Sequence, residues 1–178
     1  STLHTNDSPS AITRLLEMGI EPYLISSSLL ASLAQRLVRT ICPECKTDYF
    51  PPKEVLQELG CDGDKQIRLS RGKGCSDCYD SGFRGRTGIY ELLEMDTGLQ
   101  SLILTNPTID TLQEYLRKNG QGTLNGLGYK KVLERITIIE EIKRVTSVES
   151  VYGPSSSQPS WDDLHQAAAL GGKRSAWP

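Results

Sequence analysis

Four of the five cysteines in this 178-residue chain form two CxxC pairs, Cys42–Cys45 and Cys75–Cys78. Structural Zn²⁺ is held by four ligands in a tetrahedron, and each CxxC turn supplies two thiolates along one edge. Pro43 tightens the first turn, while Gly82 and Gly85 allow tight turns after the second. The spacing therefore predicts a closed zinc site formed by all four thiolates.

Two disulfides are the alternative for these cysteines, and they would require an oxidising compartment and a small secreted domain. The length of the chain and the paired CxxC layout favour the metal instead. A closed site has no open coordination position, so its zinc cannot activate water. We expect it to be architectural, and we expect Cys61, outside both pairs, to be a thiol without a metal role.

The charge of the chain restricts its partners. A formal net charge of −2 gives no overall attraction to nucleic acid or to an anionic membrane. No apolar run approaches the length of a membrane span. Six basic residues lie around the second cysteine pair, against only Asp77 and Asp80; they are Lys65, Arg68, Arg71, Lys73, Arg84 and Arg86. They could bind phosphate or simply form a solvated charged face.

The chain lacks a complete active site of its own. A phosphate-binding loop needs GxxxxGK followed by Ser or Thr, but Gly72-Lys73 is followed by Gly74 and Gly172-Lys173 by Arg174. HExxH, GxSxG and GxGxxG are also missing from the sequence. With only two histidines, and with four cysteines assigned to metal, neither a Ser-His-Asp nor a Cys-His hydrolase is expected.

Caps and apolar periodicity predict the elements that carry these residues. Residues 1–5 are typical of the end of a strand, and a helix capped at residues 7–8 should end at Gly19. A short helix should follow from Pro22 to about Ser28. Residues 29–41 fit both helical and strand periodicity, with propensity on the side of a helix.

The remaining elements follow from similar signals. We expect a helix after Pro51-Pro52, a short strand at 67–69 and a longer strand at 87–95. Four helices should follow, at about 97–105, 108–120, 124–133 and 138–145. Residues 147–178 are poor in apolar side chains and rich in Gly, Pro and Ser, so they are predicted to be disordered.

Several segments, in order, resemble the type II secretion and type IV pilus-assembly ATPases, in the branch with a four-cysteine zinc domain. The first resembles the histidine box of that superfamily, and together they cover residues 1 to about 146. The segments are Ser1–Asn6, Ala11–Leu16, Ala34–Pro43, Cys75–Cys78, Gly82–Leu92, Thr123–Leu124, Lys131–Val132, Thr137, Glu141 and Arg144–Thr146.

The resemblance implies a cytoplasmic, hexameric, RecA-like P-loop motor that docks at the inner membrane. Such a motor hydrolyses ATP with Mg²⁺ to drive type II secretion or type IV pilus assembly. Its partners would be its own copies and the platform and recruiting proteins of the machine, without nucleic acid. The Walker A and Walker B segments of the family precede the histidine box. We therefore expect this chain to be the later part of a longer protein and to be inactive in ATP hydrolysis by itself.

The same resemblance implies roles for single residues. His4 matches the histidine-box residue that is thought to sense the γ-phosphate, and it is the expected catalytic residue. Arg14 and Arg86 lie in matched segments and are candidates for nucleotide or subunit-interface contacts. Arg84, Arg36 and Arg39 are weaker candidates, and surface ion pairs are the alternative for each arginine. The family fold also makes residues 30–40 a strand of the sheet.

The predicted fold is α/β, the C-terminal portion of a RecA-like P-loop motor domain with an inserted zinc-ribbon subdomain and a helical extension. The expected divisions are 1–41 (motor), 42–86 (zinc), 87–146 (strand and helices) and 147–178 (tail). Two alternatives without catalysis stay open: a nucleic-acid-binding zinc ribbon and a zinc-stapled protein-interaction module. Against the former, only Tyr79, Phe83 and Tyr90 are expected near the arginines as stacking platforms.

Overall fold

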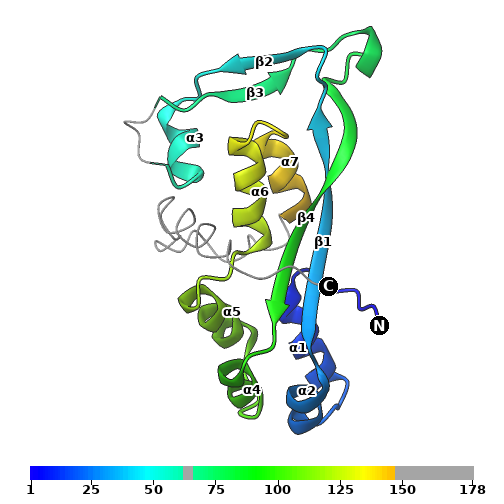
Figure 1. Cartoon of the computed structure of the whole chain (residues 1–178), viewed down its shortest axis with the longest axis vertical. Coiled ribbons are helices and arrows are strands. Elements are labelled where there is room, and N and C mark those ends of the chain that lie inside the picture. The colour runs from blue at the N-terminus through cyan, green and yellow to red at the C-terminus, as the bar shows by residue number, and fades with distance from the viewer. Residues whose placement is uncertain (62–65, 147–178) are drawn as a thin grey trace, which may run out of the picture.

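A long two-stranded ribbon organises the computed structural model, which describes residues 1–61 and 66–146 as a mixed α/β fold. Strand β1 (Ala31–Ile41) pairs antiparallel with β4 (Phe83–Glu94). The register places Ala31 opposite Glu94 at one end and Arg39 opposite Arg86 near the other. Figure 1 shows the ribbon connecting the cysteine-bearing end of the molecule to a group of helices at the opposite end.

The ribbon settles the ambiguity of residues 29–41 in favour of the strand. Ala34 and Val38 are buried, whereas Leu33 and Leu37 on the other face are 60% and 50% exposed. This alternation has the period of two that a strand requires. Helical propensity is overridden here because β4 supplies a full-length partner and helices supply a core for one face.

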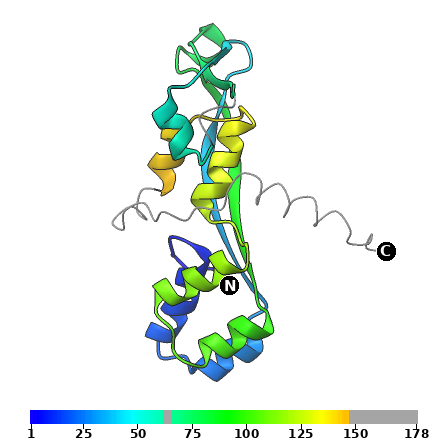
Figure 2. The same ribbon diagram turned by 90° about the vertical axis from the view of Figure 1, so that its left-hand side faces the viewer.

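The helices cover only one face of the ribbon. Helices α6 (Leu124–Leu133) and α7 (Ile139–Thr146) pack on its middle, where one core cluster includes Val38, Ile89 and Ile142. A second cluster lies around Leu93 at the end of the ribbon that carries α1 (Ser8–Glu17), α2 (Pro22–Ser28), α4 (Thr97–Ile103) and α5 (Ile109–Lys118). Figure 2 shows α6 in front of the ribbon, and the side chains that leave the opposite face, among them Leu33 and Leu37, are exposed within the described residues.

The N-terminal helices agree with the sequence predictions. Helix α1 (Ser8–Glu17) is capped by Asp7, whose Oδ1 accepts a hydrogen bond from Ser10 N at 2.8 Å. Helix α2 (Pro22–Ser28) follows. The expected strand end at residues 1–5 was wrong, since these residues form neither helix nor strand. The carbonyl of Thr5 has no strand partner and instead accepts a hydrogen bond from the side chain of Arg36 on β1.

A second pair of strands builds the cysteine-bearing end. Strand β2 (Lys46–Tyr49), which the sequence did not predict, pairs antiparallel with β3 (Leu69–Gly72). Helix α3 (Lys53–Glu58) lies between them in the chain, and a 3₁₀ turn, η1 (Ser76–Cys78), precedes β4. The strand expected at 67–69 begins later, and the strand expected at 87–95 begins earlier, at Phe83.

The C-terminal helices begin where the sequence predicted. Thr108 caps α5 (Ile109–Lys118) and Thr123 caps α6. Helix α4 (Thr97–Ile103) is capped by Asp96 and ends slightly before the expected residue 105. Across residues 1–61 and 66–146, no helix has the length and apolar character needed to cross a membrane. The predicted disordered tail, 147–178, lies outside the described residues.

Candidate functional site

The four paired cysteines meet at one point. Their sulfurs all lie within 4.8 Å of one another. The Sγ atoms of Cys42 and Cys75 are 3.9 Å apart, those of Cys45 and Cys78 are 3.8 Å apart, and those of Cys75 and Cys78 are 3.6 Å apart. A tetrahedral zinc with Zn–S bonds of about 2.3 Å requires S···S distances of roughly 3.8 Å. The cluster is therefore compatible with a four-thiolate metal site.

Disulfide bonds do not account for this cluster. All four cysteines are thiols, and their sulfur separations are nearly twice the ~2.05 Å of an S–S bond. Cys61 also forms no disulfide and is buried in the core beside α3, away from the cluster. These positions agree with a metal centre of four residues that leaves Cys61 out.

The backbone around the second cysteine pair is shaped to hold thiolates. Cys78 Sγ accepts hydrogen bonds from the backbone N–H groups of Cys75 and Gly82, both at 3.3 Å. Tyr79 and Asp80 have positive φ angles of 50° and 58°, which turn the chain back toward the sulfurs. The left-handed region is unfavourable for a tyrosine. A bound metal that fixes the turn would offset this cost.

The pKa values of neighbouring thiols move in opposite directions in the absence of metal charge. Burial is the largest influence on both, and with the Cys78 thiol as a partner it raises the pKa of Cys75 to about 12. At Cys78 burial is outweighed by backbone N–H groups and neighbouring thiols, which lower the pKa to about 7. A bound divalent cation would favour the thiolate at every ligand.

The predicted catalytic residue, His4, is exposed and lies in the irregular segment before α1. Arg14 is exposed on α1, and its Nη1 pairs with Glu17 Oε2 at 3.2 Å. Both side chains are more than half exposed, so this ion pair contributes little to stability. Figure 1 shows α1, which carries Arg14, and the N-terminus of the chain in the half of the molecule away from the cysteine-bearing end.

Arg86 lies at the other end, exposed on β4 and opposite Arg39. Arg39 is three residues from Arg36, the β1 residue that contacts the His4 segment. Three residues span about 10 Å along a strand, and an odd spacing places the side chains of Arg36 and Arg39 on opposite faces. Arg86, paired with Arg39, is therefore also distant from the His4 segment. Within residues 1–61 and 66–146, no hydrogen bond or ion pair joins His4, Arg14 and Arg86, so one chain does not assemble them into a single site.

Two of the three weaker arginine candidates, Arg36 and Arg39, have side-chain partners inside the chain. Arg36 donates from Nη2 to the carbonyl oxygens of Asn6 at 2.7 Å and Thr5 at 3.3 Å. Arg39 Nη2 bonds Glu141 Oε1 at 2.6 Å, and its guanidinium lies 4.1 Å from the centroid of the Phe83 ring. The carbonyl of Arg84 accepts a hydrogen bond from the Thr40 hydroxyl, while its side chain is exposed.

Basic side chains near the cysteine cluster stack on rings that the sequence did not single out. Arg68 lies 5.2 Å from the centroid of Phe50, and Arg71 lies 5.4 Å from that of Tyr49. Tyr79, which the sequence did single out, is 93% exposed. Part of the basic surface is therefore already engaged in cation–π contacts within the chain.

Two carboxylates that the sequence motifs did not single out as functional are buried. Glu91 is 6% exposed on β4, and Glu141 is 2% exposed on α7. Glu91 could have been recognised, because alternation places it between Ile89 and Leu93 on the inward face, where an acidic side chain needs partners. Glu141 likewise precedes Ile142 on the apolar side of a helix.

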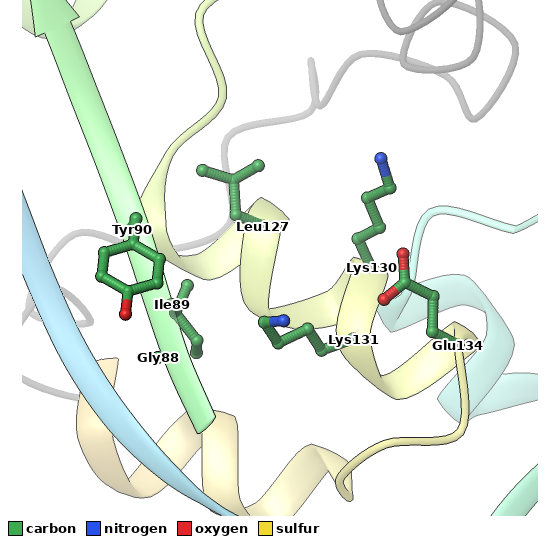
Figure 3. A pocket seen from close by; sticks show the side chains of 7 residues that line it. All are labelled: Gly88, Ile89, Tyr90, Leu127, Lys130, Lys131 and Glu134. Carbon is green, nitrogen blue, oxygen red and sulfur yellow. The ribbon is translucent and has the colours of Figure 1, made fainter. Parts of the chain in front are cut away.

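An open cavity of about 230 Å³ lies between β4 and α6. Figure 3 shows Leu127 and Lys131 of α6 across from Ile89 and Tyr90 of β4. The residues that line the cavity are Gly88, Ile89, Tyr90, Leu127, Lys130, Lys131 and Glu134. None of the residues predicted to contact nucleotide lines it.

Comparison with known proteins identifies the class. Residues 1–144 match the family model described as type II/IV secretion system protein, and the chain belongs to this family. The type II secretion system protein E of Pseudomonas aeruginosa is 46% identical over 149 residues, covering 84% of this chain and 30% of that protein. The type II secretion system ATPase E of Vibrio cholerae is 47% identical over 146 residues, covering 82% and 29%.

A pilus protein is similar over the same region. The type IV pilus assembly ATPase PilB of Thermus thermophilus is 42% identical over 145 residues, covering 80% of this chain and 16% of that protein. The chain thus spans less than a third of the length of these relatives. Its resemblance to secretion and pilus-assembly ATPases, inferred from the motifs, is confirmed at the level of the family.

Proposed function

We propose that this chain is the C-terminal portion of a RecA-like, hexameric ATPase that powers type II secretion or type IV pilus assembly. The observation that carries the proposal is the four-thiolate cluster, inserted between the paired strands β1 and β4 of a chain whose residues 1–144 match this family. The full protein would bind ATP with Mg²⁺ through Walker segments that lie outside this sequence.

Zinc would have a structural role in this assembly. Cys42, Cys45, Cys75 and Cys78 would hold it as thiolates, closing the site and joining the end of β1 to the start of β4. The short strands β2 and β3 have few buried residues, so the metal would supply cohesion that a core does not. A closed site leaves ATP chemistry to other residues.

His4 would act in the intact motor by contacting the γ-phosphate. A neutral imidazole offers one donor and one acceptor, which suit a phosphate oxygen and an ordered water. Arg14 and Arg86 would serve at a nucleotide site or at a subunit interface, where guanidinium groups stabilise phosphate charge. Because they lie apart within one chain, a shared nucleotide would have to bring them together across subunits.

The bare face of the ribbon supports a larger sheet in the full protein. Leu33, Leu37, Tyr90 and Leu92 form it, and each is about half exposed. The ribbon has two strands, so neither β1 nor β4 has a strand on its outer edge in the described part of the chain, although Glu141 and Ile136 bond the β1 edge at Arg39 and Ile41. Unpaired strand edges and an uncovered apolar face are usually buried. The remaining motor domain would cover them.

The motor would work in the cytoplasm, held at the inner membrane through platform and recruiting proteins of its machine. The names of the relatives support a secretion or pilus machine, without deciding between them. No nucleic-acid partner is proposed, in keeping with the net charge of −2.

ATP hydrolysis by the full-length protein tests the proposal. We expect the full-length protein to hydrolyse ATP as a hexamer and residues 1–178 alone to show no turnover above background. His4→Ala in the full-length protein should lower kcat far more than it raises KM, because a γ-phosphate contact acts chiefly in the transition state. Arg86→Lys should impair hydrolysis while leaving the zinc content unchanged.

Four results would each contradict a part of this proposal. Turnover by residues 1–178 alone would mean that an active site lies within this chain. An unchanged kcat in His4→Ala would remove the histidine from the mechanism. Loss of zinc in Arg86→Lys would make that arginine a folding residue, and a wild-type rate would make it ordinary surface charge.

A further inference from the structure

The short segment from His4 to Ser8 is held on the ribbon by side chains from both strands. From β1, Arg36 Nη2 donates to the carbonyl oxygens of Asn6 and Thr5, at 2.7 and 3.3 Å. From β4, Glu91 Oε2 accepts a hydrogen bond from Ser8 N at 2.6 Å. Arg36 therefore bonds the carbonyl groups of this segment and Glu91 bonds its N–H group, although the segment has no strand partner of its own.

Glu91 also reaches a second element. Its other oxygen, Oε1, accepts a hydrogen bond from Leu124 N at 3.2 Å, at the start of α6. One buried carboxylate thus joins the first turn of α1 to the first turn of α6. Helix N-termini favour negative charge, and two such termini stabilise a carboxylate that burial would otherwise penalise. Burial nevertheless raises the pKa of Glu91, with Asp7 adding to the effect and Ser8 opposing it.

A third contact extends from the same segment to α5. Asp7 is buried, and while its Oδ1 caps α1, its Oδ2 accepts from Gln113 Nε2 at 3.2 Å. The residues that follow His4 are thereby tied to β1, β4, α5 and α6. A carboxylate in a core position with two backbone donors has a fixed geometry, unlike an exposed side chain.

We infer that Glu91 and Arg36 are positioning residues for His4: together they fix the His4 segment on the ribbon and align it with α6. The inference rests on the proposed ATPase function and assigns these two residues no contact with nucleotide. Displacement of a reacting or sensing group by about 1 Å can lower a rate about a hundredfold. Loosening the segment should therefore impair the step that depends on His4, without weakening ATP binding to the same degree.

The test compares Glu91→Gln, His4→Ala and their combination in the full-length hexamer. Glutamine keeps the size of the side chain but replaces one acceptor oxygen with a donor, which would face either Ser8 N or Leu124 N. We expect kcat to fall about tenfold to a hundredfold with KM changed less than about twofold. The double variant should be no slower than His4→Ala alone, because Glu91 acts through His4.

Glu54→Gln is the control, since Glu54 is exposed on α3 and lies on neither strand of the ribbon. It should keep wild-type kcat and KM. Zinc content and the urea-unfolding midpoint identify any variant that has lost its fold. If Glu91→Gln does not fold, Arg36→Met takes its place in the comparison with His4→Ala. The side chain of Arg36 is partly exposed, so its replacement leaves no unpaired polar group in the core.

Separate outcomes overturn separate statements. A normal kcat in His4→Ala overturns the proposed role of the histidine, and this inference with it. An impaired His4→Ala together with a wild-type Glu91→Gln overturns this inference alone. Multiplying effects in the double variant would show that Glu91 acts independently of His4 and would also overturn it.

Discussion

At the scale of residues, a few polar side chains hold together elements that are far apart in the sequence. The four cysteines bring the residues that follow β1 close to the residues that precede β4. Glu141 on α7 accepts from the guanidinium and the backbone N–H of Arg39 and from Arg144. Burial alone would raise the pKa of Glu141, but these donors outweigh it and lower the pKa to about 2.

Removal of one cysteine should release the metal. Cys75→Ser leaves three thiolates for a tetrahedral ion, so we expect the purified chain to lose most of a content of about one zinc. Residues 40–90 should also become more accessible to protease. Metal analysis and limited proteolysis measure the two effects. Cys61→Ser should keep its zinc, and zinc loss in that variant would contradict the ligand assignment.

The Glu141 contacts should stabilise the fold in a pH-dependent way. The folded pKa of about 2 lies below an unfolded value of about 4.3, so the stabilisation is complete above that value and lost as pH falls toward 2. Glu141→Gln should lower the free energy of unfolding by about 2 kcal/mol at pH 7. Urea unfolding at several pH values measures this difference.

Glu140→Gln is the control for that measurement, because Glu140 is the exposed neighbour. Both variants lose zinc equally as thiolates protonate, so their difference isolates the contribution of Glu141. A difference that stays constant down to pH 2 would assign the effect to packing rather than to charge.

At the scale of elements, α6 shows how close the helices lie to the ribbon. A Cβ added at Gly128 would lie 2.7 Å from Ile142 Cγ2 on α7 and 3.2 Å from Ile89 Cδ1 on β4. At Gly126, two residues earlier, its nearest neighbour would be Thr123 Oγ1 at 3.5 Å, an ordinary contact. One glycine is needed for packing and the other is not.

Alanine should therefore have opposite effects at these two positions. Gly126→Ala should raise the free energy of unfolding by about 0.5–1 kcal/mol, because alanine loses less backbone entropy in a helix. Gly128→Ala should lower it by about 2 kcal/mol through overpacking. Thermal or urea unfolding of the two variants measures the change in the free energy of unfolding. Equal changes would show that α6 does not pack as described.

At the scale of the whole molecule, the ribbon is covered on one face and bare on the other (Figures 1 and 2). The covered face holds two core clusters, one for each group of helices. The bare apolar face fits a chain that spans at most 30% of its relatives. In the full-length motor proposed above, the remaining domain would cover this face.

A cysteine on the bare face should report whether it is covered. With Cys61→Ser as background, we expect Leu37→Cys to react rapidly with a thiol reagent in residues 1–178 and about tenfold more slowly in the full-length protein. Lys118→Cys, at the exposed end of α5, should react at similar rates in both. Equal rates for Leu37→Cys would contradict the larger sheet.

The sequence by itself determined the features that depend on neighbouring residues. The two CxxC turns identified the four cysteines that cluster. The cap expected at residues 7–8 and the helix start expected at residue 108 were confirmed by Asp7 and Thr108, because a cap bonds backbone N–H groups within its own turn. Strand β2 gave no comparable signal, since its four residues become a strand only by pairing with β3.

Only the tertiary structure decided how distant segments meet. It made residues 31–41 a strand, because β4 supplied a partner and α6 and α7 supplied a core. It also turned Glu91 from one acidic residue in an apolar strand into a bridge between Ser8 and Leu124, which are 83 and 33 residues away in sequence. Such contacts depend on the register of the ribbon, which no local pattern encodes, because burial and pairing across the whole chain select it.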